Sequence, residues 1–199
     1  MKTNAAFGLA TFALLFAFTQ IAIAQGPKHS LRDDIRGLYS PSPESRARAS
    51  ARLVEAGPAA IPSLKSIVCG AYKSDSDVAW REAAKAVGQL KAEDASLCLV
   101  RLLARDPTLN VFASEETIIA YDPAYAALLQ IGEPAIPSIS MALLSLHPDQ
   151  AFLGLRILQK IGTPEAKAAV EAYIEALENQ TKLAKGVLSD FPRENQGRK

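Results

Sequence analysis

The chain contains few of the residues that carry most enzyme chemistry. Its 199 residues include two histidines, two cysteines and one tryptophan. Neither His29 nor His147 has a cysteine or an acidic residue at the spacing that metal ligands require, so we expect structural or solvent-exposed roles for both. The sequence therefore predicts no catalytic residues, no metal site and no cofactor.

The chain also lacks an excess of charge of either sign. It has 22 basic and 21 acidic residues, and Lys2 is the only charged residue among the first 24. The remainder is therefore neutral and has no overall field that would attract phosphate backbones or anionic membranes. We expect no nucleic-acid partner.

The N-terminal segment differs from the rest of the sequence. Residues 5–20 are almost entirely apolar, and Ala22-Ile23-Ala24 places small residues at positions −3 and −1 before Gln25. This pattern predicts a secretory signal peptide over residues 1–24 and export to the periplasm or the medium. The alternative is an uncleaved membrane anchor, because the apolar run is just long enough to span a bilayer.

Four segments of the chain share one spacing of apolar residues. Each has a small residue, an aliphatic residue four positions later and another apolar residue three positions after that, which lines one face of a helix. The four sets are Ala49, Leu53 and Ala56; Ala83, Val87 and Leu90; Ala124, Leu128 and Ile131; and Gly154, Leu158 and Ile161. Glycine follows in three sets and Lys91 in the second. A second apolar-periodic helix follows each, which predicts helical hairpins over about 43–73, 76–105, 114–146 and 148–178.

The runs Arg81–Leu90 and Ala127–Pro137 resemble HEAT-like repeats of the phycobilisome-lyase type, and the resemblance covers roughly residues 43–178. It implies an all-α protein, a right-handed α-solenoid of about four helical hairpins. Similar repeats occur in lyases, hydroxylases, glycosylases and non-enzymatic scaffolds, so the resemblance indicates architecture rather than function. The His-Glu pairs with which HEAT-type hydroxylases hold iron are absent from this sequence.

The segments around the repeats are predicted from local signals. Ser30 begins a capping-box pattern for a short helix within the connector 25–42, ahead of a repeat domain over 43–185. The longer connection 106–122 contains a run from Ser114 that is either a separate helical turn or the front of a helix kinked at Pro123. Residues 186–199 are polar and are predicted to be a disordered tail.

Several charged residues are close enough in sequence to suggest a site. Asp33-Asp34 and Glu115-Glu116 are paired carboxylates, but each pair follows a serine in the first turn of a predicted helix, where it complements the helix dipole. Arg46, Arg48 and Arg52 cluster on the first repeat helix. We expect this cluster to be a solvent-exposed face with pairing between residues four apart.

Cys69 and Cys98 fall on the second helices of neighbouring repeats. Aligned by repeat, Cys69 lies five or six residues further along its helix, an axial offset of roughly 8 Å. Disulfide-bonded cysteines need Cα atoms within about 7 Å, so the alignment favours unpaired cysteines and leaves a disulfide as the alternative.

The second helices of stacked hairpins line the concave side of a solenoid. Their side opposite the core is less polar than a solvated surface, and the candidate partner-binding residues there are Ser66, Leu97, Arg101, Met141 and Leu144. The alternatives are that the 106–122 connection or the tail covers this stripe, or that the helical phase differs by one residue.

These features favour a non-enzymatic exported scaffold that binds another envelope or secreted protein through its concave face. One alternative is a protein resembling the bilin lyases, which would hold a hydrophobic tetrapyrrole-like ligand with Cys69 as its only possible tether. The other is a purely structural spacer.

Overall fold

The computed structural model describes residues 30–71 and 77–189, and its regular secondary structure is entirely helical over these ranges, as the all-α prediction requires. The predicted signal peptide, residues 1–24, lies outside the described residues, as do residues 190–199 of the predicted tail. The α-helices are α1 (Leu31–Gly37), α2 (Pro43–Glu55), α3 (Ile61–Gly70), α4 (Asp77–Gln89), α5 (Ser96–Leu102), α6 (Glu115–Tyr121), α7 (Pro123–Ile131), α8 (Ile136–Ala142), α9 (Pro148–Ile161) and α10 (Pro164–Ser189). Short 3-10 helices are η1 (Gly57–Ala60), η3 (Glu93–Ala95), η4 (Glu133–Ala135) and η5 (Leu143–Ser145).

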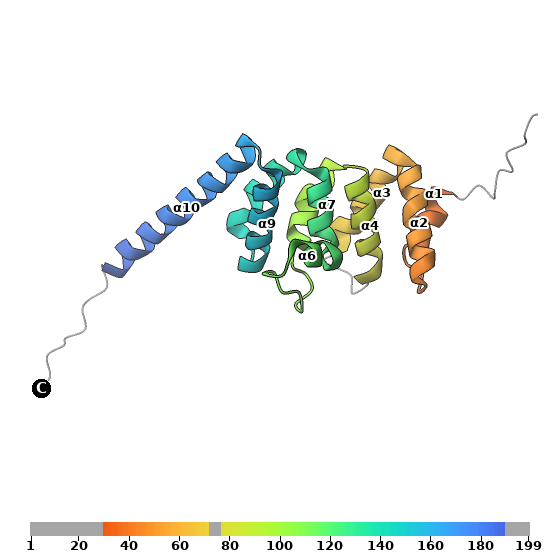
Figure 1. The fold of residues 1–199 in the computed structure, drawn as a ribbon, viewed down its shortest axis with the longest axis horizontal. Helices are drawn as coiled ribbons and strands as arrows, with labels where there is room; N and C mark the ends of the chain where they lie inside the picture. Colours follow the sequence, from red (N-terminus) through yellow and green to blue (C-terminus); the bar gives the residue numbers. More distant parts are fainter. Residues whose placement is uncertain (1–29, 72–76, 190–199) are drawn as a thin grey trace, which may run out of the picture.

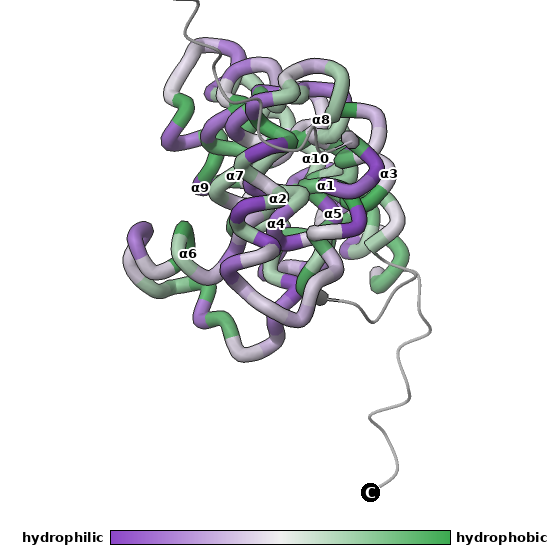
Figure 2. The backbone as a smooth tube through the Cα atoms, turned by 90° about the vertical axis from the view of Figure 1, so that its right-hand side faces the viewer, coloured by the Kyte–Doolittle hydropathy of each residue, from purple (hydrophilic) through white to green (hydrophobic). Residues whose placement is uncertain are grey.

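The helices form two layers. The first layer contains α2, α4, α7 and α9, in which each helix packs against the next (Figure 1). The second layer contains α3, α5, α8 and α10, again with successive helices in contact. Figure 2 shows the two layers side by side, with α6 outside the first layer next to α7.

The core lies between the layers and includes most of the residues that define the repeated spacing, although Ala56 is exposed and Leu90 and Ile161 are half-buried. Ala49, Leu53, Val87, Leu128 and Leu158 are at most 1% exposed. Gly88, which follows Val87, allows close packing: a Cβ added at Gly88 of α4 would lie 2.7 Å from the Cα of Ala127 in α7. This contact explains why the two central helices of the first layer approach each other so closely.

The first helix of each hairpin ends with a residue of positive φ. Gly57, Gly132 and Gly162 have φ of 64°, 75° and 69°, as expected for glycines that follow a helix. Lys91 adopts the same kind of conformation with φ of 50°, although it carries a side chain. The second hairpin therefore also has a residue of positive φ after its first helix, without the glycine that best tolerates this conformation.

The long connection resolves one alternative that the sequence left open. α6 and α7 are separate helices, and Asp122 between them accepts hydrogen bonds from the backbone N–H groups of Ala124 and Tyr125. Pro123 is thus the first residue of α7 and not a kink within a longer helix.

The ends of the described structure differ from the prediction in two ways. Ser30 caps α1 as expected. Asp34, however, is 5% exposed and forms an ion pair with Arg52 of α2. Asp34 therefore does more than complement the dipole of α1, and Arg52 does not belong to a solvent-exposed face. The packing of α1 against α2 buries Asp34 and covers part of Arg52. At the other end, α10 continues through Gly186 to Ser189, beyond the predicted start of the tail.

Candidate functional site

The two cysteines are joined in a disulfide with their Cα atoms 5.0 Å apart, so the expectation of unpaired cysteines was wrong. The reason is the relative position of α3 and α5. The Nζ of Lys65 lies 2.8 Å from Oδ2 of Asp94, which pairs residues 29 apart, as the disulfide does. The second helices are therefore shifted along each other by about five residues from the alignment of the repeats.

The disulfide has a consequence for the predicted chemistry. Residues 30–71 and 77–189 contain no free cysteine, so no thiol is available there to tether a ligand. The bilin-lyase-like alternative therefore loses the one attachment point, Cys69, on which it depended.

The predicted partner-binding residues are mostly exposed. Met141 and Leu144 expose 70% and 51% of their surface, and Arg101 is also exposed, whereas Leu97 is half-buried against the core. Ser66 is exposed but lies apart from them, in a small hollow of about 140 Å³ near Tyr39 and Trp80. The structure thus gives an exposed surface on α5, α8 and η5 and does not join all five residues in one groove. The connection before α7 does not cover this surface, because α6 packs on the first layer.

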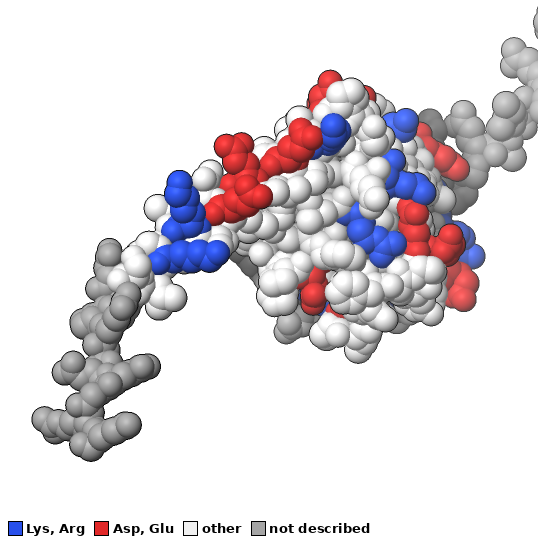
Figure 3. All heavy atoms as spheres, turned by 60° about the vertical axis from the view of Figure 1, so that its left-hand side comes forward, with Lys and Arg blue, Asp and Glu red and all other residues white. Residues whose placement is uncertain are grey.

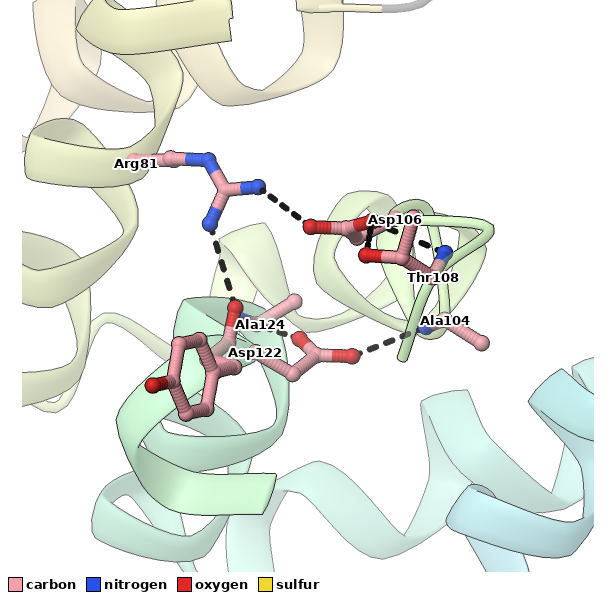
Figure 4. Close-up of polar contacts among 7 residues, drawn as sticks. Arg81, Ala104, Asp106, Thr108, Asp122 and Ala124 are labelled. Carbon is pink, nitrogen blue, oxygen red and sulfur yellow. Dashed lines mark hydrogen bonds and ion pairs between the residues drawn. The ribbon is translucent and has the colours of Figure 1, made fainter. Parts of the chain in front are cut away.

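The polar cluster around Asp122 joins α4, the 103–114 loop and α7 (Figure 4). One carboxylate oxygen of Asp122 accepts the two N–H groups that begin α7, and the other accepts the N–H of Ala104 at 2.8 Å. Arg81 of α4 donates to the carbonyl of Tyr121 at 3.1 Å and pairs with Asp106 at 3.5 Å. Asp106 in turn accepts hydrogen bonds from the N–H and the hydroxyl of Thr108.

Both carboxyl groups of this cluster have shifted pKa values, for opposite reasons. Burial raises the pKa of Asp122 despite its three backbone hydrogen bonds. The hydroxyl and N–H of Thr108, together with the charge of Arg81, lower the pKa of Asp106. Because both oxygens of Asp122 accept hydrogen bonds from the backbone, we interpret the cluster as a structural link between α4, the 103–114 loop and α7 and not as an acid–base site. The Asp-Pro pair was the sequence signal for this cap, and sequence reasoning did not use it.

An apolar groove lies between α9 and α10, which sequence reasoning missed. It has a volume of about 620 Å³, and its apolar lining includes Phe152 and Leu155 of α9 with Val170, Tyr173, Ile174 and Leu177 of α10. Phe112 from the 103–114 loop packs on Phe152, with ring centroids 4.9 Å apart. A second hollow of about 490 Å³ continues along α10 from Ile174 to Lys185.

The groove opens onto a mostly uncharged face that a row of charges borders along α10, as Figure 3 shows, and Arg156 and Lys167 also contribute to its lining. Its α10 residues have the periodicity of core positions, which is why the sequence alone does not reveal it. In the described residues no helix follows α10, so these positions remain partly uncovered: Ile174 and Leu177 expose 49% and 40% of their surface.

The described residues contain no group of three or more His, Cys, Asp or Glu placed to hold a metal ion. Within the same ranges no single helix has both the length and the apolarity to cross a membrane. One pair, Pro123–Ile131 with Glu133–Ser145, passes that test only when joined, and it is bent by 113°.

Comparison with known proteins gives no relative from which a function could be transferred. No family model matches the chain, and no curated protein matches it.

Proposed function

We propose that this protein is an exported, non-enzymatic scaffold of helical repeats that binds another envelope or secreted protein. In this proposal the two layers are a right-handed α-solenoid of about four HEAT-like hairpins, and the second layer presents the binding surface. The succession of contacts within each layer supports a repeat architecture, since each hairpin packs mainly against its neighbours.

The exposed side chains of Met141 and Leu144 carry the proposal. Long apolar side chains that remain 70% and 51% exposed only three residues apart in the chain are typical of a contact surface, because their burial by a partner is favourable. α5 packs beside α8, so Arg101 adds a positive charge to the same layer. The surface would suit a partner with an apolar patch and a carboxylate at its edge.

The proposal is tested by crosslinking and co-purification of the chain from its native cell envelope. Arg101→Glu with Met141→Glu should lower the yield of the crosslinked partner about tenfold, since each change places a charge where apolar or opposite-charge contact is needed. Circular dichroism of the variant should match that of the unaltered protein.

The matched control carries Arg48→Glu with Val78→Glu, which alters a basic and an apolar residue on exposed positions of the first layer. This control should retain the partner. Equal capture by the Arg101/Met141 variant and by the unaltered protein would overturn the assignment of the surface.

A further inference from the structure

α10 is much longer than its contacts with the rest of the protein require. Its 26 residues span about 39 Å, and it extends away from the two layers in Figure 1. Its first half packs against α8 and α9, where Ala166 and Ala169 are buried. Every residue from Leu177 to Ser189 is exposed.

The apolar side of α10 continues along this exposed half. Val170, Tyr173 and Leu177 follow one another at intervals of three and four residues, and Ala184 and Val187 continue the same side of the helix. The first three line the groove with α9, whereas Leu183, Val187 and Leu188 expose 72%, 62% and 71% of their surface. A helix end with this much uncovered apolar surface needs a partner to be well packed.

The charged side of α10 changes sign along its length. Lys167 lies on the same flank close to the body and pairs with Glu171 at 3.4 Å. Beyond this pair, Glu175 and Glu178 are followed by Lys182 and Lys185 at intervals of three or four residues, so these residues also lie on that flank of the helix. The acidic residues lie next to the body and the basic residues toward the free end, as Figure 3 shows.

We infer that this groove is the interface for a second copy of the chain, with the two α10 helices antiparallel. The exposed half of α10 in one copy lies against Val170, Tyr173 and Leu177 of the other, and the reverse contact is identical by two-fold symmetry. Antiparallel pairing brings the acidic part of each charged flank beside the basic part of its partner, whereas parallel pairing would place the two charged flanks on opposite sides of the contact.

The C-terminal residues that follow α10 in the sequence offer no equivalent apolar segment. Residues 190–199 contain Phe191 as their one large apolar side chain, too few to cover both Tyr173 and Leu177 as well as the leucines of the exposed half. The dimer goes beyond the proposed function and does not involve the proposed partner-binding surface, because Arg101, Met141 and Leu144 lie outside the groove lining.

The test is sedimentation velocity of the full chain, as processed by the expressing cell, over a dilution series. The expected mass is twice that of one chain. Leu188→Glu alters an exposed residue that is far from the buried core, so the fold should persist while dimer affinity falls at least about tenfold.

Charge exchange tests the direction of pairing. Lys182→Glu with Lys185→Glu should weaken the dimer about tenfold, and Glu175→Lys with Glu178→Lys should do the same, because each change acts twice in a two-fold interface. Combining all four substitutions should restore most of the affinity, since the reversed flanks are again complementary. The control pair Arg32→Glu and Arg48→Glu alters charge equally on exposed positions of α1 and α2 and should leave the dimer unchanged.

A monomer at every concentration of the series would overturn the inference. Detection by native mass spectrometry of a monomer with a small apolar ligand bound would also overturn it, because the groove would then hold a ligand and not a second copy. A dimer that Leu188→Glu does not weaken would also overturn it. Failure of these tests leaves the partner capture in the Arg101/Met141 experiment unaffected, so the two proposals are judged separately.

Discussion

At the scale of single residues, Lys91 shows how a turn persists without its preferred residue. The N–H of Ala92 bonds the carbonyl of Val87 at 3.1 Å, which is the bond that closes a Schellman motif after a helix. Lys91 supplies the left-handed conformation of that motif with φ of 50°. The backbone therefore forms this turn while the lysine Cβ is held in an unfavourable position.

Lys91→Gly is expected to raise the free energy of unfolding by about 0.5–1 kcal/mol, because glycine adopts this conformation without steric cost. Urea denaturation followed by circular dichroism measures the change. Gly162→Ala is the matched substitution in the opposite direction and should lower stability by a similar amount, since Gly162 has φ of 69°. No difference between Lys91→Gly and the unaltered protein would contradict the strain.

Ser96 is a second residue that lowers the stability of the folded protein. Its hydroxyl is buried and has no hydrogen-bond partner among the described residues. Ser96→Ala should therefore raise the free energy of unfolding by about 1 kcal/mol, since it removes an unsatisfied polar group and leaves little empty space. Ser50 offers a control, because its hydroxyl donates to the carbonyl of Glu82 at 3.2 Å and its replacement by alanine should be destabilising. A loss of stability in Ser96→Ala would show that the hydroxyl has a partner.

At the scale of helices, the sequence predicts what each helix buries better than where its neighbour lies. The spacing of Ala49 and Leu53, or of Ala124 and Leu128, follows from helix geometry and is confirmed by burial. The shift between α3 and α5 depends on how two helices slide against each other, which the spacing of apolar residues within each helix does not specify. The groove beside α10 was missed for a related reason: periodicity identifies an apolar side but not whether another helix covers it.

The disulfide between Cys69 and Cys98 fixes the position of α3 along α5. It closes a loop with a sequence separation of 29 residues, for which the loss of chain entropy in the unfolded state corresponds to about 3.6 kcal/mol of stability. Reduction should lower the free energy of unfolding by about that amount, as measured by urea denaturation with and without dithiothreitol. The double variant Cys69→Ala with Cys98→Ala should resemble the reduced protein and should not respond to dithiothreitol. Identical stability of the oxidised and reduced forms would contradict the bond's contribution.

At the scale of the whole molecule, stability should vary along the stack of helices. α4 and α7 are packed against each other in the middle of the first layer, and each also contacts the second layer. The end of α10 has no such neighbours and consists of exposed residues. Local opening therefore needs little disruption at the end of α10 and nearly global unfolding in α7.

Native hydrogen exchange should resolve this gradient and its dependence on assembly. In dilute protein, the amides of residues 178–189 should exchange fastest among the described helices and those of α4 and α7 slowest, because exchange follows the free energy of local opening. At high concentration the same distal amides should become protected if two copies cover each other's α10, since association stabilises the state that is bound. The Lys182→Glu and Lys185→Glu variant should exchange rapidly at both concentrations. Strong protection of residues 178–189 in the dilute monomer would instead mean that this half of α10 is stable by itself, and that its apolar side needs no second chain.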